Sequence, residues 1–141
     1  MNVITILEVK TDVNLKNFIK FPMELYKNNK NYVPPLINDE KNIWNRQENA
    51  ALAYSEFKRF LAFKDEKVVG RIAVMINHKE VNELGINKVR FGWLDFIDDL
   101  EVTKVLIQTA IDFAKEKKVS KIEGPMGFTN LDKSGMLTMG F

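Results

Sequence analysis

Hydrophobic and polar residues alternate over the first positions of the chain and then change to a helical spacing. Positions 3–10 alternate, with apolar residues on both faces at the start, which predicts a strand. From 15 to 26 apolar residues recur at intervals of three and four, which predicts a helix with Asp12 or Asn14 as its N-cap. Pro22 lies inside this pattern, so we expect it either to kink the helix or to open a second one.

The next segments predict one short helix and three strands. Pro35 opens the helix, whose single apolar stripe is formed by Leu36, Ile37, Glu40, Ile43 and Trp44. Alternation at 57–63 predicts a strand, and 68–76 is apolar on both faces, which is typical of a central strand. A polar connection from Asn77 to Asn87 leads to a third strand at 89–97.

The last third of the chain predicts a strong helix and one more strand. Asp98 and Asp99 cap a helix whose broad apolar face runs from Val102 to Ala114. Residues 119–124 form the predicted strand, and the segment 125–141 is rich in Gly and Met without a regular period.

This order of elements predicts the fold class. The three middle strands can pair as an antiparallel meander, while the last two strands flank a helix and are therefore expected to be parallel. We predict an α+β protein (a three-layer α/β arrangement) with a mixed, mostly antiparallel sheet flanked by helices.

Composition and charge exclude several classes of function. The 141 residues suit one domain, and 21 Lys+Arg against 19 Asp+Glu leave a net charge of +2. With no cysteine, disulfides, thiol catalysis and Cys-ligated zinc are excluded. The near-neutral balance argues against nucleic-acid binding, and the longest apolar stretches are too short to cross a membrane. Because the first residues lack the apolar core of a signal peptide, we expect a cytoplasmic protein.

Asp95 is the candidate catalytic residue. It lies in an otherwise apolar strand, where a carboxylate must be exposed, paired or functional. If the strands around Asn82 pair with facing positions summing to about 165–166, Arg71 lies opposite Asp95 or Leu94. A cross-strand ion pair is the favoured interpretation, and a general base that deprotonates an amine is the alternative.

Two aromatic residues and two glycines are the candidate cofactor-contacting positions. Trp93 and Phe96 lie on the same strand as Asp95, and the alternative for such aromatics is a place in the core. Gly124 and Gly127 follow the last predicted strand, where glycines allow a ligand close to the backbone or simply turn the chain.

The remaining polar residues carry less chemistry. His78 is the one histidine and is expected in a solvated loop, so no metal site is predicted. Arg46, Arg59 and Arg90 are interpreted as surface charge.

Four motifs in order resemble a poorly characterised bacterial group of GNAT-like proteins. They are Phe21-Pro22-Met23-Glu24-Leu25-Tyr26, Asn31-Tyr32-Val33-Pro34-Pro35-Leu36, Val69-Gly70-Arg71-Ile72-Ala73 and Gly124-Pro125-Met126-Gly127-Phe128. The resemblance implies a GNAT acyltransferase fold and an acyl-CoA-dependent N-acyltransferase. Its cofactor would be acetyl-CoA or another acyl-CoA, and its substrate a small-molecule amine. The alternative is a non-catalytic GNAT-fold domain with a degenerate CoA site, which binds a small ligand or a partner protein.

The junction between the third meander strand and the following helix departs from the pattern of that family. GNAT enzymes bind the CoA pyrophosphate there with a Gln/Arg-x-x-Gly-x-Gly/Ala loop, because glycines let backbone N–H groups approach phosphate. Here the junction reads Ile97-Asp98-Asp99-Leu100-Glu101-Val102, without glycine or a basic residue. Helix capping is the favoured role of these acids.

Proteins of that group continue beyond the point where this sequence stops. We therefore expect residues 1–141 to form a single GNAT-like domain that is truncated and incomplete at its C-terminus. A sheet without its last strands leaves an open edge. We expect self-association through that edge or through the apolar tail 136–141.

Overall fold

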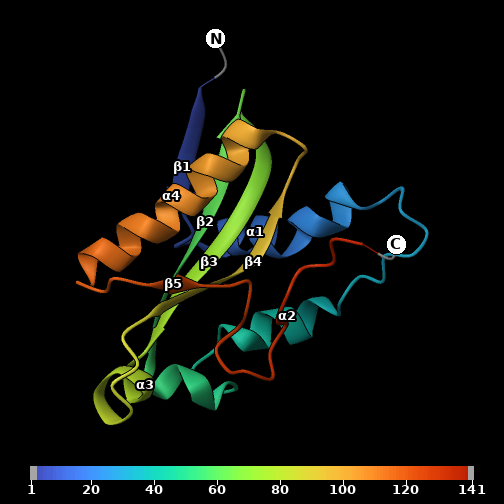
Figure 1. Ribbon diagram of the computed structural model, residues 1–141. Coiled ribbons are helices and arrows are strands. Elements are labelled where there is room, and N and C mark those ends of the chain that lie inside the picture. The colour runs from blue at the N-terminus through green and yellow to red at the C-terminus, as the bar shows by residue number, and fades with distance from the viewer. Residues whose placement is uncertain (1–2, 140–141) are drawn as a thin grey trace.

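A computed structural model describes residues 3–139 and contains one five-stranded sheet (Figure 1). The strands, in their order across the sheet, are β1 (Ile4–Glu8), β2 (Ser55–Lys64), β3 (Lys67–Asn77), β4 (Val89–Phe96) and β5 (Ile122–Glu123). Neighbours are antiparallel from β1 to β4, and β4 pairs with β5 in parallel. The predicted fold class, a mixed and mostly antiparallel sheet, is confirmed.

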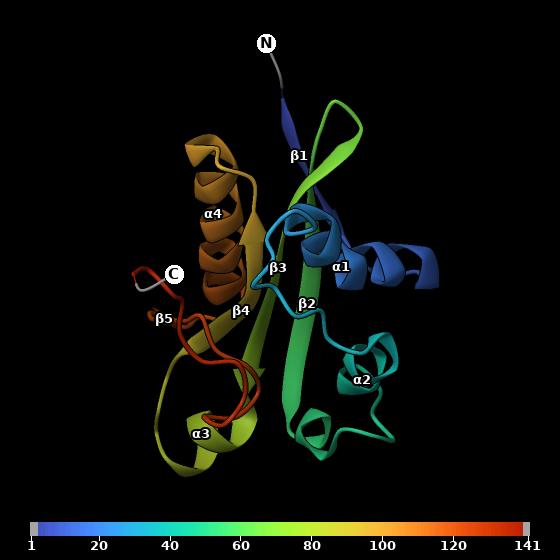
Figure 2. The ribbon, with the colours of Figure 1, turned by 90° about the vertical axis from the view of Figure 1, so that its right-hand side faces the viewer.

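Helices lie on both faces of this sheet (Figure 2). They are α1 (Asp12–Leu25), α2 (Ile37–Ile43), α3 (His78–Glu83), α4 (Leu100–Glu116) and the short 3-10 helix η1 (Ala50–Ala53). On one face α4 buries Leu106 and Phe113 against Ile72 and Val74 of β3. On the other face, Phe18 of α1 and Trp44 after α2 belong to a second, aromatic core.

A β-bulge interrupts the pairing of β3 with β4. Arg71 lies opposite Asp95 and Ala73 lies opposite Gly92, so Trp93 and Leu94 together face the single residue Ile72. The predicted pairing, with facing positions summing to 165–166, is therefore confirmed on both sides of the bulge. Trp93 adopts a left-handed backbone conformation with φ of 46°, an unfavourable one for a bulky residue.

Helix α1 continues through Pro22 to Leu25, so the expectation that Pro22 opens a second helix is wrong. A proline has no N–H, and the carbonyl four residues earlier loses its helical donor. That carbonyl belongs to Phe18, and it accepts a hydrogen bond of 2.8 Å from Nη1 of Arg71 instead. The hydrogen bond from Arg71 of β3 thus partly offsets the free-energy cost of placing Pro22 inside the helix.

Several predicted boundaries differ from the observed ones. Thr11, not Asp12 or Asn14, caps α1, and its hydroxyl accepts from the Asn14 N–H. The predicted polar connection contains α3, because Oδ1 of Asn77 accepts from the N–H groups of Lys79 and Glu80 and so caps a helix. His78 is thus the first residue of a helix rather than part of a loop.

The last strand is also shorter than predicted. Lys118 has φ of 57° and Val119 donates back to the carbonyl of Ala114, so α4 ends at Glu116 and residues 117–121 form a connection. The strand ends at Glu123 because Gly124 is followed by Pro125, which cannot donate to the ladder.

Apolar side chains are exposed in the segment after β5. Met136, Leu137 and Met139 are all at least half exposed, whereas Gly140 and Phe141 of the expected association tail lie outside the described residues. Among the described helices, none has the length and apolar character needed to span a membrane.

Candidate functional site

A cleft of about 960 Å³ opens where β4 bulges beside the end of α1. Its walls are the connection from α1 to α2, the second half of β4 and the segment after β5. Most of the lining is apolar, and the lining residues that carry the argument below are Tyr26, Tyr32, Arg71, Trp93, Asp95 and Phe96. The cleft therefore contains three of the five predicted site residues.

Asp95 is held between a cation and a phenol. Its Oδ2 accepts from Nε of Arg71 at 2.8 Å, and its Oδ1 accepts from the hydroxyl of Tyr26 at 2.9 Å. The Arg71 side chain is only 7% exposed and its guanidinium lies 5.0 Å from the centre of the Phe18 ring. The favoured interpretation, a cross-strand ion pair, is thus the observed geometry, and the carboxylate also lines the cleft.

The two tyrosines of the cleft stay protonated. Burial raises the pKa of Tyr26 well above its ordinary value, and the negative charge and hydrogen bond of Asp95 raise it further. Burial is also the main cause that raises the pKa of Tyr32, whose ring lies 5.0 Å from that of Tyr26. The Tyr26 hydroxyl is therefore a fixed hydrogen-bond donor toward Asp95.

A buried carboxylate that sequence reasoning did not identify adjoins the cleft. Glu40 of α2 is 4% exposed; it accepts from Nε1 of Trp93 at 3.3 Å and forms an ion pair with Lys133. The Lys133 ammonium also lies 5.4 Å from the Trp93 ring centre. The presence of Glu40 in an otherwise apolar stripe was the signal in the sequence, because an acid on such a face must find a partner.

Trp93 belongs both to the core and to the cleft. It is 6% exposed, its ring lies 4.8 Å from that of Trp44 and 5.9 Å from that of Phe128, and it also lines the cleft. Phe96, the last residue of β4, lines the cleft as well.

Gly124 and Gly127 lie against protein atoms rather than in the cleft lining. A Cβ on Gly124 would be 2.3 Å from the carbonyl oxygen of Phe91, and one on Gly127 would be 2.3 Å from Cβ of Asp132. Distances this short do not occur between real side chains, so both positions need glycine to let two parts of the chain approach each other.

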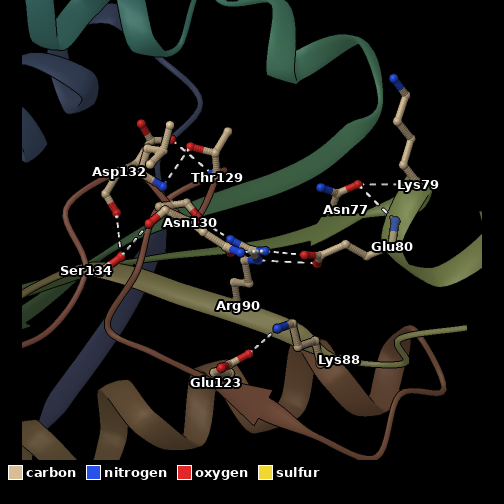
Figure 3. Close-up of polar contacts among 12 residues, drawn as sticks. Asn77, Lys79, Glu80, Lys88, Arg90, Glu123, Thr129, Asn130, Asp132 and Ser134 are labelled. Carbon is tan, nitrogen blue, oxygen red and sulfur yellow. Dashed lines mark hydrogen bonds and ion pairs between the residues drawn. The ribbon is translucent and has the colours of Figure 1, made fainter. Parts of the chain in front are cut away.

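Arg90 holds the segment after β5 in place (Figure 3). Its guanidinium forms an ion pair with Glu80 of α3, and Nη2 also donates to Oδ1 of Asn130 at 2.9 Å. Nη1 donates to the carbonyl of Gly127 at 3.4 Å. The prediction of Arg90 as surface charge is wrong, because the residue is 2% exposed.

Arg59 also differs from its predicted place on the surface. It is half-buried, with its guanidinium 5.1 Å from the Trp44 ring centre, and burial lowers its pKa. Arg46 is exposed, as predicted, and donates to the carbonyl of Leu52.

The start of α4 is occupied by a carboxylate of the chain itself. Oδ1 of Asp99 accepts from the Glu101 N–H at 2.9 Å, and Oδ2 pairs with Lys64 at 2.8 Å. The hydrogen bond from Lys64 and that from the Glu101 N–H hold the pKa of Asp99 below its ordinary value. The predicted capping role of Asp99 is confirmed. This donor set does not match a pyrophosphate, which needs free N–H groups and positive charge.

The sequence was compared with family models and with curated proteins. No family model matches the chain. It is 34% identical to protein YghO of Escherichia coli over 136 residues, which are 94% of this chain and 35% of that protein. It is 27% identical to a bacterial ceramide synthase of Caulobacter vibrioides over 139 residues, 98% of this chain and 36% of the relative. The chain thus spans about a third of the length of these curated relatives.

Among solved structures, a GNAT-family acetyltransferase of Staphylococcus aureus superimposes with a TM-score of 0.58 at 20% identity. The match covers 85% of this chain and 71% of the other. The chain therefore has the GNAT-like acyltransferase fold that the four motifs implied.

Proposed function

We propose that this chain is an acyltransferase domain that forms an amide from an acyl thioester and an amine. The observation that carries the proposal is Asp95, a carboxylate placed in an apolar cleft at the β4 bulge of a GNAT-like fold. In this reaction the amine nitrogen attacks the thioester carbonyl carbon. The C–N bond forms, the C–S bond breaks, and the sulfur leaves as a thiol with the proton that the nitrogen loses.

Asp95 is the proposed acceptor of that proton. It is 17% exposed and lines the cleft, so an amine in the cleft can reach its carboxylate. The buried Arg71 and the protonated Tyr26 hold the carboxylate in one orientation, which is the requirement for a positioned base.

A long-chain amine is the proposed acceptor class. Nonpolar side chains form most of the cleft wall, and at its rim Val33 and Leu137 are 83% and 64% exposed. Such a surface suits an apolar chain better than a sugar or a peptide. The ceramide synthase relative points in the same direction, since a ceramide is an N-acylated long-chain amino alcohol.

The test is amide formation from S-octanoyl-pantetheine and sphinganine, followed by mass spectrometry. We expect Asp95→Asn to lower the rate by about 10²–10⁴-fold, the usual contribution of a positioned base. Asp112→Asn, an acid on the exposed side of α4, is the matched control and keeps the rate. Thermal melts of both variants verify that they are folded at the assay temperature. A folded Asp95→Asn variant with at least half the rate would contradict the role of Asp95.

A second candidate function is a non-catalytic domain that binds a small ligand or a partner protein. The observation in its favour is that both oxygens of Asp95 already accept hydrogen bonds from protein groups. Binding of S-octanoyl-pantetheine without amide formation from any amine offered would favour this function over the first.

A further inference from the structure

We infer that the junction of β4 and α4 does not hold the pyrophosphate of coenzyme A. A thioester donor is then held by its acyl and pantetheine portion in the cleft, without its nucleotide. This inference rests on the proposed function, because it concerns the donor of the same reaction.

The junction is where a long donor leaving the cleft along β4 would arrive. Phe96, the last residue of β4, lines the cleft, and Asp98 follows two residues later. Helix α4 begins at Leu100, four residues after Phe96, so its N-terminal N–H groups follow closely along the chain from this end of the cleft. In an α/β protein such a helix start is a natural place for a phosphate group.

The start of α4 is already capped by a carboxylate of the chain, that of Asp99. The Asp99 carboxylate accepts from the Glu101 N–H, and Thr103 N–H donates to the Asp99 carbonyl. A phosphate would have to displace Asp99, which is also paired with Lys64. The hydrogen bonds from Lys64 and from the Glu101 N–H both favour the ionised form of Asp99, so a carboxylate remains at the helix start at neutral pH.

The surrounding charge is also unfavourable to a pyrophosphate. Asp98, Asp99 and Glu101 contribute three negative charges, and two lysines, Lys64 and Lys104, pair with Asp99 and Glu101. The sum is 2 − 3 = −1, and Asp98 is exposed with no ion pair among the described residues. The local potential therefore repels a dianionic group instead of attracting it.

Gly124 and Gly127, the glycines predicted to contact a ligand, do not offer another place for the phosphates. The position that a Cβ would take at Gly124 is already occupied by Phe91, and the one at Gly127 is occupied by Asp132. These two predicted ligand-contacting glycines therefore do not form a phosphate site beside the cleft.

The experiment compares two donors that share one acyl group and the pantetheine arm. Calorimetric titration of the 141-residue chain with octanoyl-CoA and with S-octanoyl-pantetheine gives two dissociation constants at low and at moderate ionic strength. We expect them to agree within about threefold, with octanoyl-CoA the weaker ligand at low salt because its phosphates meet the acidic junction.

A charge variant tests the same point. Asp98→Asn with Glu101→Gln leaves the Asp99 cap in place and is expected to tighten octanoyl-CoA by about two- to threefold at low salt. It should leave S-octanoyl-pantetheine unchanged. The control is Asp112→Asn with Glu116→Gln at the other end of α4, which should change neither ligand.

The outcomes separate the two proposals. Octanoyl-CoA binding more than about threefold more tightly than S-octanoyl-pantetheine would overturn this inference while leaving the proposed function intact. Binding of neither thioester would overturn the proposed function and this inference with it. Equal binding of both, with the charge variant acting only on octanoyl-CoA, supports the inference.

Discussion

Replacement of Arg71 by Met is the sharpest test of how the cleft is built. The substitution removes the partner of Asp95 and the donor to the Phe18 carbonyl while keeping most of the side-chain volume. The Phe18 carbonyl then lies where water has little access, because Phe18 is fully buried, while Asp95, which faces the cleft, loses the cation paired with it.

The expected loss follows from the two unpaired groups. Breaking a buried ion pair by removing one partner costs about 3–5 kcal/mol, and we expect the lower end because Tyr26 still donates to Asp95. The unpaired Phe18 carbonyl adds about 1 kcal/mol. A total of about 4 kcal/mol is a large part of the roughly 5–15 kcal/mol by which a domain of this size is stable.

Urea unfolding followed by tryptophan fluorescence measures this loss, because Trp44 and Trp93 lie in the core beside the cleft. With a slope of about 2 kcal/mol/M, the midpoint of Arg71→Met should fall by about 2 M. Arg46→Met is the control, since Arg46 is exposed and has no ion pair among the described residues; it loses only its hydrogen bond to the Leu52 carbonyl, which should cost about 1 kcal/mol.

The double variant Arg71→Met with Asp95→Leu decides between the buried pair and mere packing. Replacing both members of a buried pair by apolar groups is often neutral, so we expect the double variant to recover more than half of the loss. If the Arg71→Met loss is below about 1 kcal/mol, or if the two single losses simply add, the structural role given to this pair is wrong.

Three further outcomes are expected. Arg90→Met should lower stability by about 3 kcal/mol in urea unfolding, because it leaves the Glu80 carboxylate without its buried partner, while the neighbouring Lys88→Met should cost under about 1 kcal/mol; equal losses would contradict this. Burial raises the pKa of Tyr26 above its ordinary 10.0, so the contribution of the protonated phenol to folding stability is present below pH 10 and is lost as the pH rises further. The urea midpoint should therefore fall less steeply at alkaline pH in Tyr26→Phe than in the parent chain, and an equally steep fall would exclude this linkage. Light scattering should give a mass above that of one chain at high concentration, reduced by Leu137→Asp at the exposed segment after β5; a monomer at every concentration would refute the predicted self-association.

The local features of the candidate site followed from the sequence to a useful degree. Strand pairing in a hairpin fixes which positions face each other, so a sum of about 165–166 predicts Arg71 opposite Asp95 or Leu94, and the structure places it opposite Asp95. The acids before α4 likewise predicted a cap, because an Asp at a helix start has a local partner in the N–H two residues later. Both predictions depend on residues that are near each other in the chain or in one hairpin.

The partners of buried charges could not be predicted in the same way. Arg90 alternates with Phe91 along its strand, which predicts a solvent-facing side chain, but Glu80 of α3 and Asn130 both contact its guanidinium. Glu40 accepts hydrogen bonds from Trp93, 53 residues away in the sequence, and from Lys133, 93 residues away. The spacing of hydrophobic residues along the sequence cannot predict such pairs, because they depend on how separate helices and strands pack.

By itself, the sequence determined the order of the elements, the fold class, a position for Arg71 opposite Asp95 or Leu94, and the acidic start of α4. Each of these follows from alternation, helical spacing or capping, which act over a few residues or across one turn. Only the tertiary structure decided that Phe18 accepts from Arg71, that Tyr26 joins Asp95, and that the cleft exists at all. The physical reason is that burial and unpaired hydrogen-bonding groups are properties of the packed chain, and packing brings together residues that no local pattern connects.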